Sequence, residues 1–104
     1  MSSLKSGTET EGLEMTNVRI VRERDDIVNG WVVRADTKRF GKDAVMCEGS
    51  HDDCMKWWKG LFRDSRVEKI TAYICGFVAE YGVWVDDVIT LHRNGFEEHL
   101  SGRY

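Results

Sequence analysis

Three side chains close together in the sequence, Cys47, His51 and Cys54, have the types that bind zinc. A tetrahedral site needs thiolates and neutral imidazoles, and strong zinc motifs repeat a unit such as Cys-x2-Cys. This chain has one irregular cluster, so we expect no metal site and interpret the cysteines as small apolar side chains. A fourth ligand would have to come from a distant residue, namely Cys75, His92 or His99.

Cys54 also has part of what a catalytic nucleophile needs. It follows His51 and falls on the first turn of a predicted helix, where the helix dipole favours a thiolate. Nucleophilic catalysis requires a positioned base as well, and the chain has no Gly-rich phosphate loop, no His-Glu-x-x-His and no paired acidic motif. We therefore expect a protein that is not an enzyme, with no catalytic residue and no cofactor.

Length and composition favour one small folded unit. The chain has 104 residues, 11% of them aromatic, and a formal net charge of −3. Residues 1–15 are rich in Ser, Gly, Thr and Glu and are predicted to be a disordered tail, which leaves 16–104 as a single domain. No apolar run is long enough to span a membrane, and three cysteines do not form a disulfide framework, so we expect a cytoplasmic protein with no membrane partner.

The elements that position these side chains begin with strands. Residues 17–24 alternate apolar and charged side chains, the Asn29-Gly30 pair favours a reversal, and residues 31–36 and 44–48 are short and apolar. They predict a three-stranded antiparallel meander. Ser50 then caps a helix whose apolar stripe should pack across the meander, and this stripe contains Cys54, Trp57, Trp58, Leu61 and Phe62.

The C-terminal half is predicted to be a helical hairpin. Ser65 and Glu68 match a capping box, apolar residues then recur at helical spacing, and Gly82 ends the helix. Residues 86–93 fit a second short helix, although the β-branched residues of 83–91 leave a strand open. The predicted fold class is α+β: a three-stranded antiparallel meander followed by a packing helix and a C-terminal helical hairpin.

Residues 74–93 resemble the helix-turn-helix of small DNA-binding regulators. With Gly82 as the turn, the apolar frame of that motif falls on Phe77, Tyr81, Val83, Val88 and Leu91. The motif has a small residue where this chain has Val78, and no strongly basic segment accompanies it. A DNA-binding transcriptional regulator is therefore the alternative function. Its nucleic-acid contacts would be Thr90, His92, Arg93 and Asn94.

Adjacent tryptophans give the leading functional interpretation. Successive helical residues lie about 100° apart, so Trp57 and Trp58 cannot both point to the same part of the core. A partly exposed tryptophan among cations is typical of a protein-contact hot spot. We expect a small protein-binding regulator, adaptor or inhibitor, similar in style to accessory proteins of phages and mobile elements. The predicted contact surface is Lys56, Trp57, Trp58, Lys59 and Arg63, with Trp84 and Phe96 as a second possibility.

Overall fold

The computed structural model describes residues 15–101 and consists of one six-stranded sheet and one short helix. The predicted tail, 1–15, lies outside the described residues apart from Met15. None of the helices in residues 15–101 is long and apolar enough to cross a membrane. The elements in chain order are β1 (Thr16–Arg22), β2 (Trp31–Thr37), β3 (Gly41–Gly49), α2 (His51–Lys59), the 3-10 turn η1 (Gly60–Arg63), β4 (Lys69–Val78), β5 (Val83–His92) and β6 (Glu97–Ser101).

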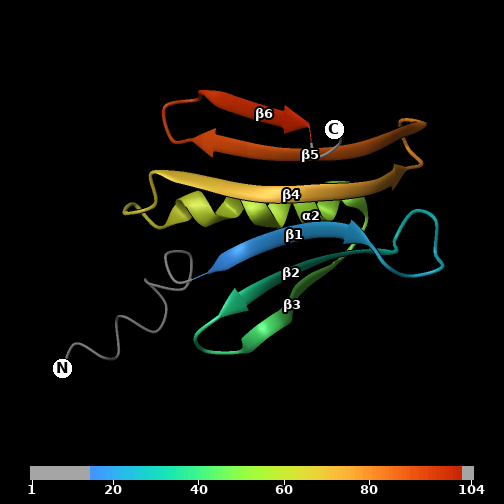
Figure 1. Cartoon of the computed structure of the whole chain (residues 1–104), viewed down its shortest axis with the longest axis horizontal. Coiled ribbons are helices and arrows are strands. Elements are labelled where there is room, and N and C mark those ends of the chain that lie inside the picture. The colour runs from blue at the N-terminus through green and yellow to red at the C-terminus, as the bar shows by residue number, and fades with distance from the viewer. Residues whose placement is uncertain (1–14, 102–104) are drawn as a thin grey trace.

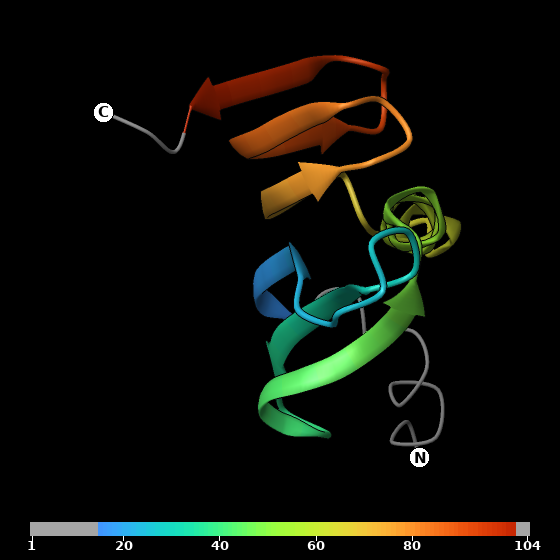
Figure 2. The ribbon, with the colours of Figure 1, turned by 90° about the vertical axis from the view of Figure 1, so that its right-hand side faces the viewer.

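The sheet joins two antiparallel three-stranded units. Its order is β3-β2-β1-β4-β5-β6, and the only parallel pair among the described strands is β1 with β4. That pair holds through three register positions, in which Arg19 to Val21 lie beside Tyr73 to Cys75. Helix α2 connects the two units and lies against one face of the sheet, close to the β1–β4 pair (Figures 1 and 2).

The core lies between α2 and that face. Strand β4 alternates strictly, with its even-numbered residues from Ile70 to Val78 buried. Cys54 and Trp58 of α2 are fully buried against them. Gly76 has φ +149°, and a Cβ there would lie 2.8 Å from the Trp31 ring, so the glycine lets β4 and the indole approach closely. The other buried core residues from the strands are Ile20, Val33 and Leu91.

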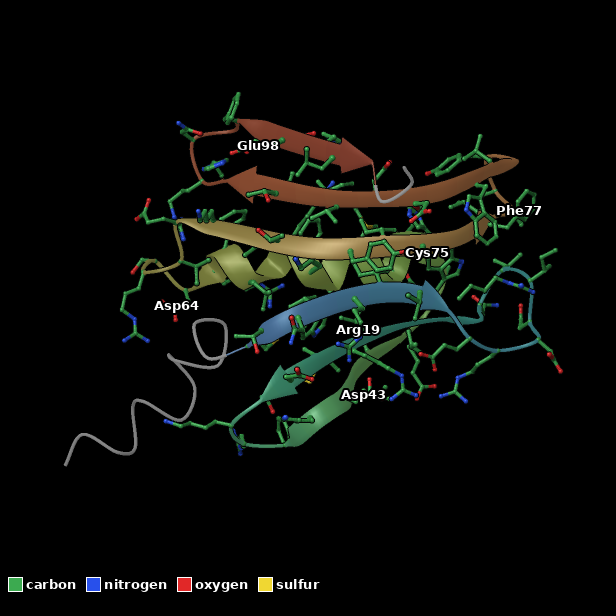
Figure 3. The ribbon with its side chains drawn as sticks, viewed as in Figure 1. Arg19, Asp43, Asp64, Cys75, Phe77 and Glu98 are labelled. Carbon is green, nitrogen blue, oxygen red and sulfur yellow. The ribbon has the colours of Figure 1, made fainter. Side chains whose placement is uncertain are left out.

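The opposite face of the sheet is polar over its N-terminal half. The Arg34 guanidinium donates to both oxygens of Glu23 (2.6 and 2.9 Å), and Arg19 pairs with the Asp43 carboxylate (Figure 3). Val32 is fully buried beneath this network although it does not belong to the core cluster under α2. No element within residues 15–101 covers this face, so ion pairs rather than a second layer shield it.

The predicted fold class is wrong: residues 15–101 form mostly one mixed six-stranded sheet with a single short helix, not a three-stranded meander with a C-terminal helical hairpin. The predicted strands and the helix after Ser50 are present, but the expected helical hairpin is the strand pair β4–β5, followed by β6. The buried set Ile70, Ala72, Ile74, Gly76 and Val78 has a period of two. Two of its members are small and therefore hard to recognise as core. The interpretation of 83–91 as a strand, which the sequence left open, is the one observed.

Candidate functional site

Helix α2 begins at a capping box, which sets its position on the sheet. The Ser50 hydroxyl accepts a hydrogen bond from the backbone N–H of Asp53 (3.1 Å), and the Asp53 carboxylate accepts one from the backbone N–H of Ser50 (3.3 Å). Acidic Asp52 and Asp53 lie in the first turn, and Lys56 and Lys59 lie in the last. These charges complement the helix dipole and stabilise a helix of only nine residues.

The two adjacent tryptophans have different roles. Trp58 is fully buried in the core, whereas Trp57 is half-buried at the margin of the apolar stripe. The angle of about 100° between successive helical residues accounts for this division. Trp58 is therefore a core residue, and Trp57 is the tryptophan of the predicted surface whose ring remains partly accessible.

A groove of about 410 Å³ runs along the outer side of α2 and η1. Trp57 and Leu61, four residues apart, supply its apolar wall, and cations stand beside them. A Cβ at Gly60 would have no heavy atom within 4 Å, so this part of the groove is open. We call it the α2 groove. Its lining residues are Asp53, Lys56, Trp57, Gly60, Leu61 and Arg63.

The cations at this surface have no charged or hydrogen-bonding partner in the part of the chain that the structure describes. Within residues 15–101, the side chains of Lys56, Lys59 and Arg63 form no ion pair or hydrogen bond. The nearest acid along the groove, Asp53, already accepts a hydrogen bond from the helix N-terminus. Lys59 lies outside the α2 groove and lines a neighbouring hollow of about 210 Å³, which Phe96 also lines. The surface is therefore apolar at its centre and positively charged around it.

Cys47 and Cys54 are neighbours at the core, whereas Cys75 lies on the opposite face of the sheet. Burial, with a smaller effect of neighbouring Cys47, raises the pKa of the Cys54 thiol to about 12. This is the opposite of the lowering expected from a helix N-terminus, because desolvation of the thiolate outweighs the dipole. Cys75 lies on the uncovered face beside Tyr73 (Figure 3), and interaction with Cys75 and then Asp86 raises the Tyr73 pKa. Among residues 15–101, no group of three or more His, Cys, Asp or Glu side chains is arranged to hold a metal ion.

The predicted helix-turn-helix is wrong, because its residues form β4, β5 and the turn between them. Three of the four residues assigned to nucleic-acid contact take part in sheet and turn contacts. The Thr90 hydroxyl lies 2.9 Å from that of Thr71 on β4, and His92 Nε2 lies 2.7 Å from the Glu98 carboxylate on β6. Asn94 Oδ1 accepts a hydrogen bond from the backbone N–H of Phe96. No recognition helix positions these side chains.

The fourth of these residues, Arg93, ties two loops together. Its Nε donates to the carbonyl of Val67 (2.9 Å), and its Nη2 donates to the carbonyls of Phe62 and Asp64, both at 2.7 Å. The guanidinium also lies 5.4 Å from the centre of the Phe62 ring, within cation–π range. Its role is therefore to hold the segment between η1 and β4 against the turn that follows β5.

Sequence reasoning missed two residues that contact or line the surface of α2 and η1. The first is Leu61, which packs against the core as its place in the apolar stripe predicts but also lines the α2 groove; its spacing of four residues from Trp57 is the signal for this second role. The second is Tyr81, whose hydroxyl donates to the Asp52 carboxylate (3.0 Å) and whose ring meets His51 edge-on. That contact joins the β4–β5 turn to the start of α2 across 29 residues, and no local pattern predicts it.

The structure also separates the second predicted pair. Trp84 lies near the start of β5, whereas Phe96 follows its end, so the two rings belong to opposite ends of the sheet.

Comparisons of the chain with protein-family models, with curated proteins and with solved structures return no match.

Proposed function

We propose that the protein is a small non-enzymatic regulator or adaptor that binds another protein through the α2 groove. The observation that carries the proposal is a half-buried indole, Trp57, beside unpaired Lys56 and Arg63 in one groove of about 410 Å³. Trp and Arg are the residues most enriched in binding hot spots, where they anchor in desolvated pockets. The complementary ligand is a segment of a partner that carries an apolar anchor flanked by carboxylates.

The shape of the site favours a peptide segment over a reacting small molecule. Chemistry requires a nucleophile or base directed at a substrate, and the α2 groove is lined by two cations, one carboxylate and apolar side chains. The Asp53 carboxylate accepts a hydrogen bond from the Ser50 backbone as part of the capping box, which gives it a structural role in the helix. Attraction between the exposed lysines and arginine and a partner's carboxylates would mainly raise the association rate. Burial of the Trp57 ring against the partner would slow dissociation of the complex.

The test is affinity capture from cells that produce the protein, quantified by mass spectrometry with four versions of the chain. Trp57→Ser removes the apolar anchor, and the double variant Lys56→Glu/Arg63→Glu reverses the groove charge. The matched control is Lys38→Glu/Lys42→Glu, which makes the same change in net charge at two exposed positions, one in the β2–β3 turn and one at the start of β3.

We expect at least one protein to be captured by the wild type and by the control, and to be reduced about tenfold or more by each groove variant, as for a residue that contributes about 1.4 kcal/mol. Equal recovery with all four versions would contradict the proposal. Loss with the control as strong as with the groove variants would also contradict it, because it would show that net charge alone is responsible.

A further inference from the structure

One end of the sheet gathers exposed apolar side chains from segments far apart in the sequence. Strands β1 and β4 are parallel, so the β1–β2 loop and the β4–β5 turn lie at the same end (Figure 1). Packing of Trp31 and Arg22 around Gly76 shows that the strand ends beside the two connections touch. We call this region the apolar end; its residues are between 37% and 60% exposed, and they are Ile27, Val28, Phe77, Tyr81, Val83 and Trp84.

The apolar end holds six of the ten large hydrophobic residues that are exposed within 15–101. Phe77 and Trp84 are directly opposite each other in the β4–β5 register, and Phe77 points to the uncovered face (Figure 3). Directly paired residues share a face, so Trp84 lies on that face too, whereas Val83 is opposite buried Val78 and Tyr81 contacts α2 on the other side. The adjacent rings of Phe77 and Trp84 therefore form the exposed apolar pair of the uncovered face, and such neighbouring apolar side chains are typical of an interaction site. The Tyr81 hydroxyl bond to Asp52 holds the turn in place, so these rings are displayed by a fixed scaffold.

The charge at this end is acidic. The segments 22–30 and 76–87 together carry six carboxylates and two arginines, Arg22 and Arg24. Arg24 pairs with Glu48 on β3 (3.0 Å), and one of the six carboxylates, Glu23, pairs with Arg34 on β2. Within residues 15–101, the side chains of Asp25 and Glu80 form no ion pair and no hydrogen bond. The sign is opposite to that of the α2 groove, so the two surfaces select partners of opposite charge.

We propose that the apolar end is a second docking surface, and that its partner is a basic protein segment in which apolar side chains alternate with Lys or Arg. The apolar side chains would cover Phe77 and Trp84. The cations would meet the free carboxylates and the face of the exposed indole, which is the aromatic ring that binds cations best. The inference is independent of the α2 groove, and together the two surfaces would let this chain bridge two proteins.

The test uses the full chain labelled with ¹⁵N and two synthetic peptides, (Lys-Val)4 and (Glu-Val)4. The chain has four tryptophans, and each gives an indole N–H signal in the ¹H–¹⁵N spectrum. We expect (Lys-Val)4 to shift the Trp84 signal in a saturable, salt-sensitive manner while the Trp57 signal stays in place. The (Glu-Val)4 peptide should leave Trp84 unchanged.

Variants separate the contributions of ring and charge. Trp84→Ser and Phe77→Ser should each abolish the binding of (Lys-Val)4, and Asp25→Asn/Glu80→Gln should weaken it about fivefold, as expected for exposed ion pairs. Phe40→Ser removes an equally exposed ring from the β2–β3 turn and is the matched control, which should bind like the wild type. Dispersion of the backbone signals confirms that each variant is folded.

Three outcomes would overturn the inference: no shift of Trp84, equal shifts with the two peptides, or equal loss in Phe40→Ser. A fourth is self-association of the wild type, seen by sedimentation and abolished by Trp84→Ser. That result would show that a second copy of the chain, rather than a separate partner, occupies the apolar end. None of these results bears on the α2 groove, whose test measures capture through different residues.

Discussion

Arg93 provides the sharpest test of how this fold is stabilised. Its guanidinium donates three hydrogen bonds at 2.7 to 2.9 Å, one to the carbonyl of Phe62 in η1 and two to the carbonyls of Asp64 and Val67 between η1 and β4, and it packs against the Phe62 ring. Hydrogen bonds from a charged group contribute about 1.5–3 kcal/mol each when buried, and less here because two of the three are exposed to water. Arg93→Ala should therefore lower the free energy of unfolding by about 2–3 kcal/mol.

The assay is urea denaturation of the wild type and the variants. The dependence of the unfolding free energy on urea concentration, measured for the wild type, is used to convert a shift in midpoint into a change in stability. For a domain of this size a loss of 2–3 kcal/mol corresponds to a fall in Tm of about 10–15 °C. Arg93→Lys should recover only part of the loss, because an ammonium lacks the planar fork that reaches carbonyls in several directions. Arg63→Ala is the matched control, since the Arg63 side chain binds no other residue within 15–101. A change in Arg93→Ala below about 0.5 kcal/mol, or an equal change in Arg63→Ala, would refute the reasoning.

Three further predictions concern glycine, tryptophan and cysteine positions. Gly76→Ala should destabilise the protein by about 2 kcal/mol in urea denaturation, because the new Cβ would clash with the Trp31 ring and residue 76 has a φ of +149°. Gly60→Ala is the control and should be neutral or slightly stabilising, because Gly60 has helical backbone angles and open space around it. Trp58→Ala should cost about 3–5 kcal/mol of stability by the same assay, and Trp57→Ala should cost much less; equal losses would contradict the division between core and groove. Burial raises the pKa of Cys54 from 9.0 to about 12, so between these values the folded chain retains a proton that the unfolded chain releases. The contribution of this thiol to stability is therefore complete below pH 9 and declines as the pH rises toward 12. The urea midpoint of Cys54→Ala should accordingly fall less than that of the wild type over this range.

The N-terminal half could be predicted because its signals are local. The alternation from residue 17 predicts the first strand of a hairpin, and Ser50 with Asp53 specifies a helix start. The hairpin is present, but its connection is the loop 23–30 rather than a tight Asn29-Gly30 turn, since neither of these two residues has a positive φ. Each of these signals involves residues within a few positions of one another, so the sequence contains them in readable form. The partial exposure of Trp57 could also be predicted, because successive helical residues lie about 100° apart and only one of two adjacent tryptophans can point into the core.

The C-terminal half could not be predicted from periodicity, because both faces of β4 carry apolar side chains. Tyr73, Cys75 and Phe77 lie on the uncovered face, while the small residues Ala72 and Gly76 lie in the core. This distribution imitates the spacing of a helix. The density of β-branched residues in β4 and β5 was the better guide, and the partner that makes this segment a strand is β1, about fifty residues earlier.

The apolar end was beyond sequence reasoning for a related reason. Trp84 could be noticed as a candidate, but its neighbours at that end come from both the β1–β2 and the β4–β5 connections. Only the parallel direction of β1 and β4 brings those connections together. A prediction of this surface therefore required the strand order, which no local signal in the chain specifies.

The β1–β4 pair, which joins the two halves of the sheet, is the place where the two halves would separate most easily. Each three-stranded half is built from local hairpins, whereas the seam between the halves rests on three register positions and on the helix packed behind it. If the halves part there, the loops that form the apolar end move away from each other and Trp58 loses one wall of its enclosure. The rings of Phe77 and Trp84 would stay paired, because both belong to the β4–β5 hairpin, but the β1–β2 loop would no longer contribute Ile27 and Val28 beside them.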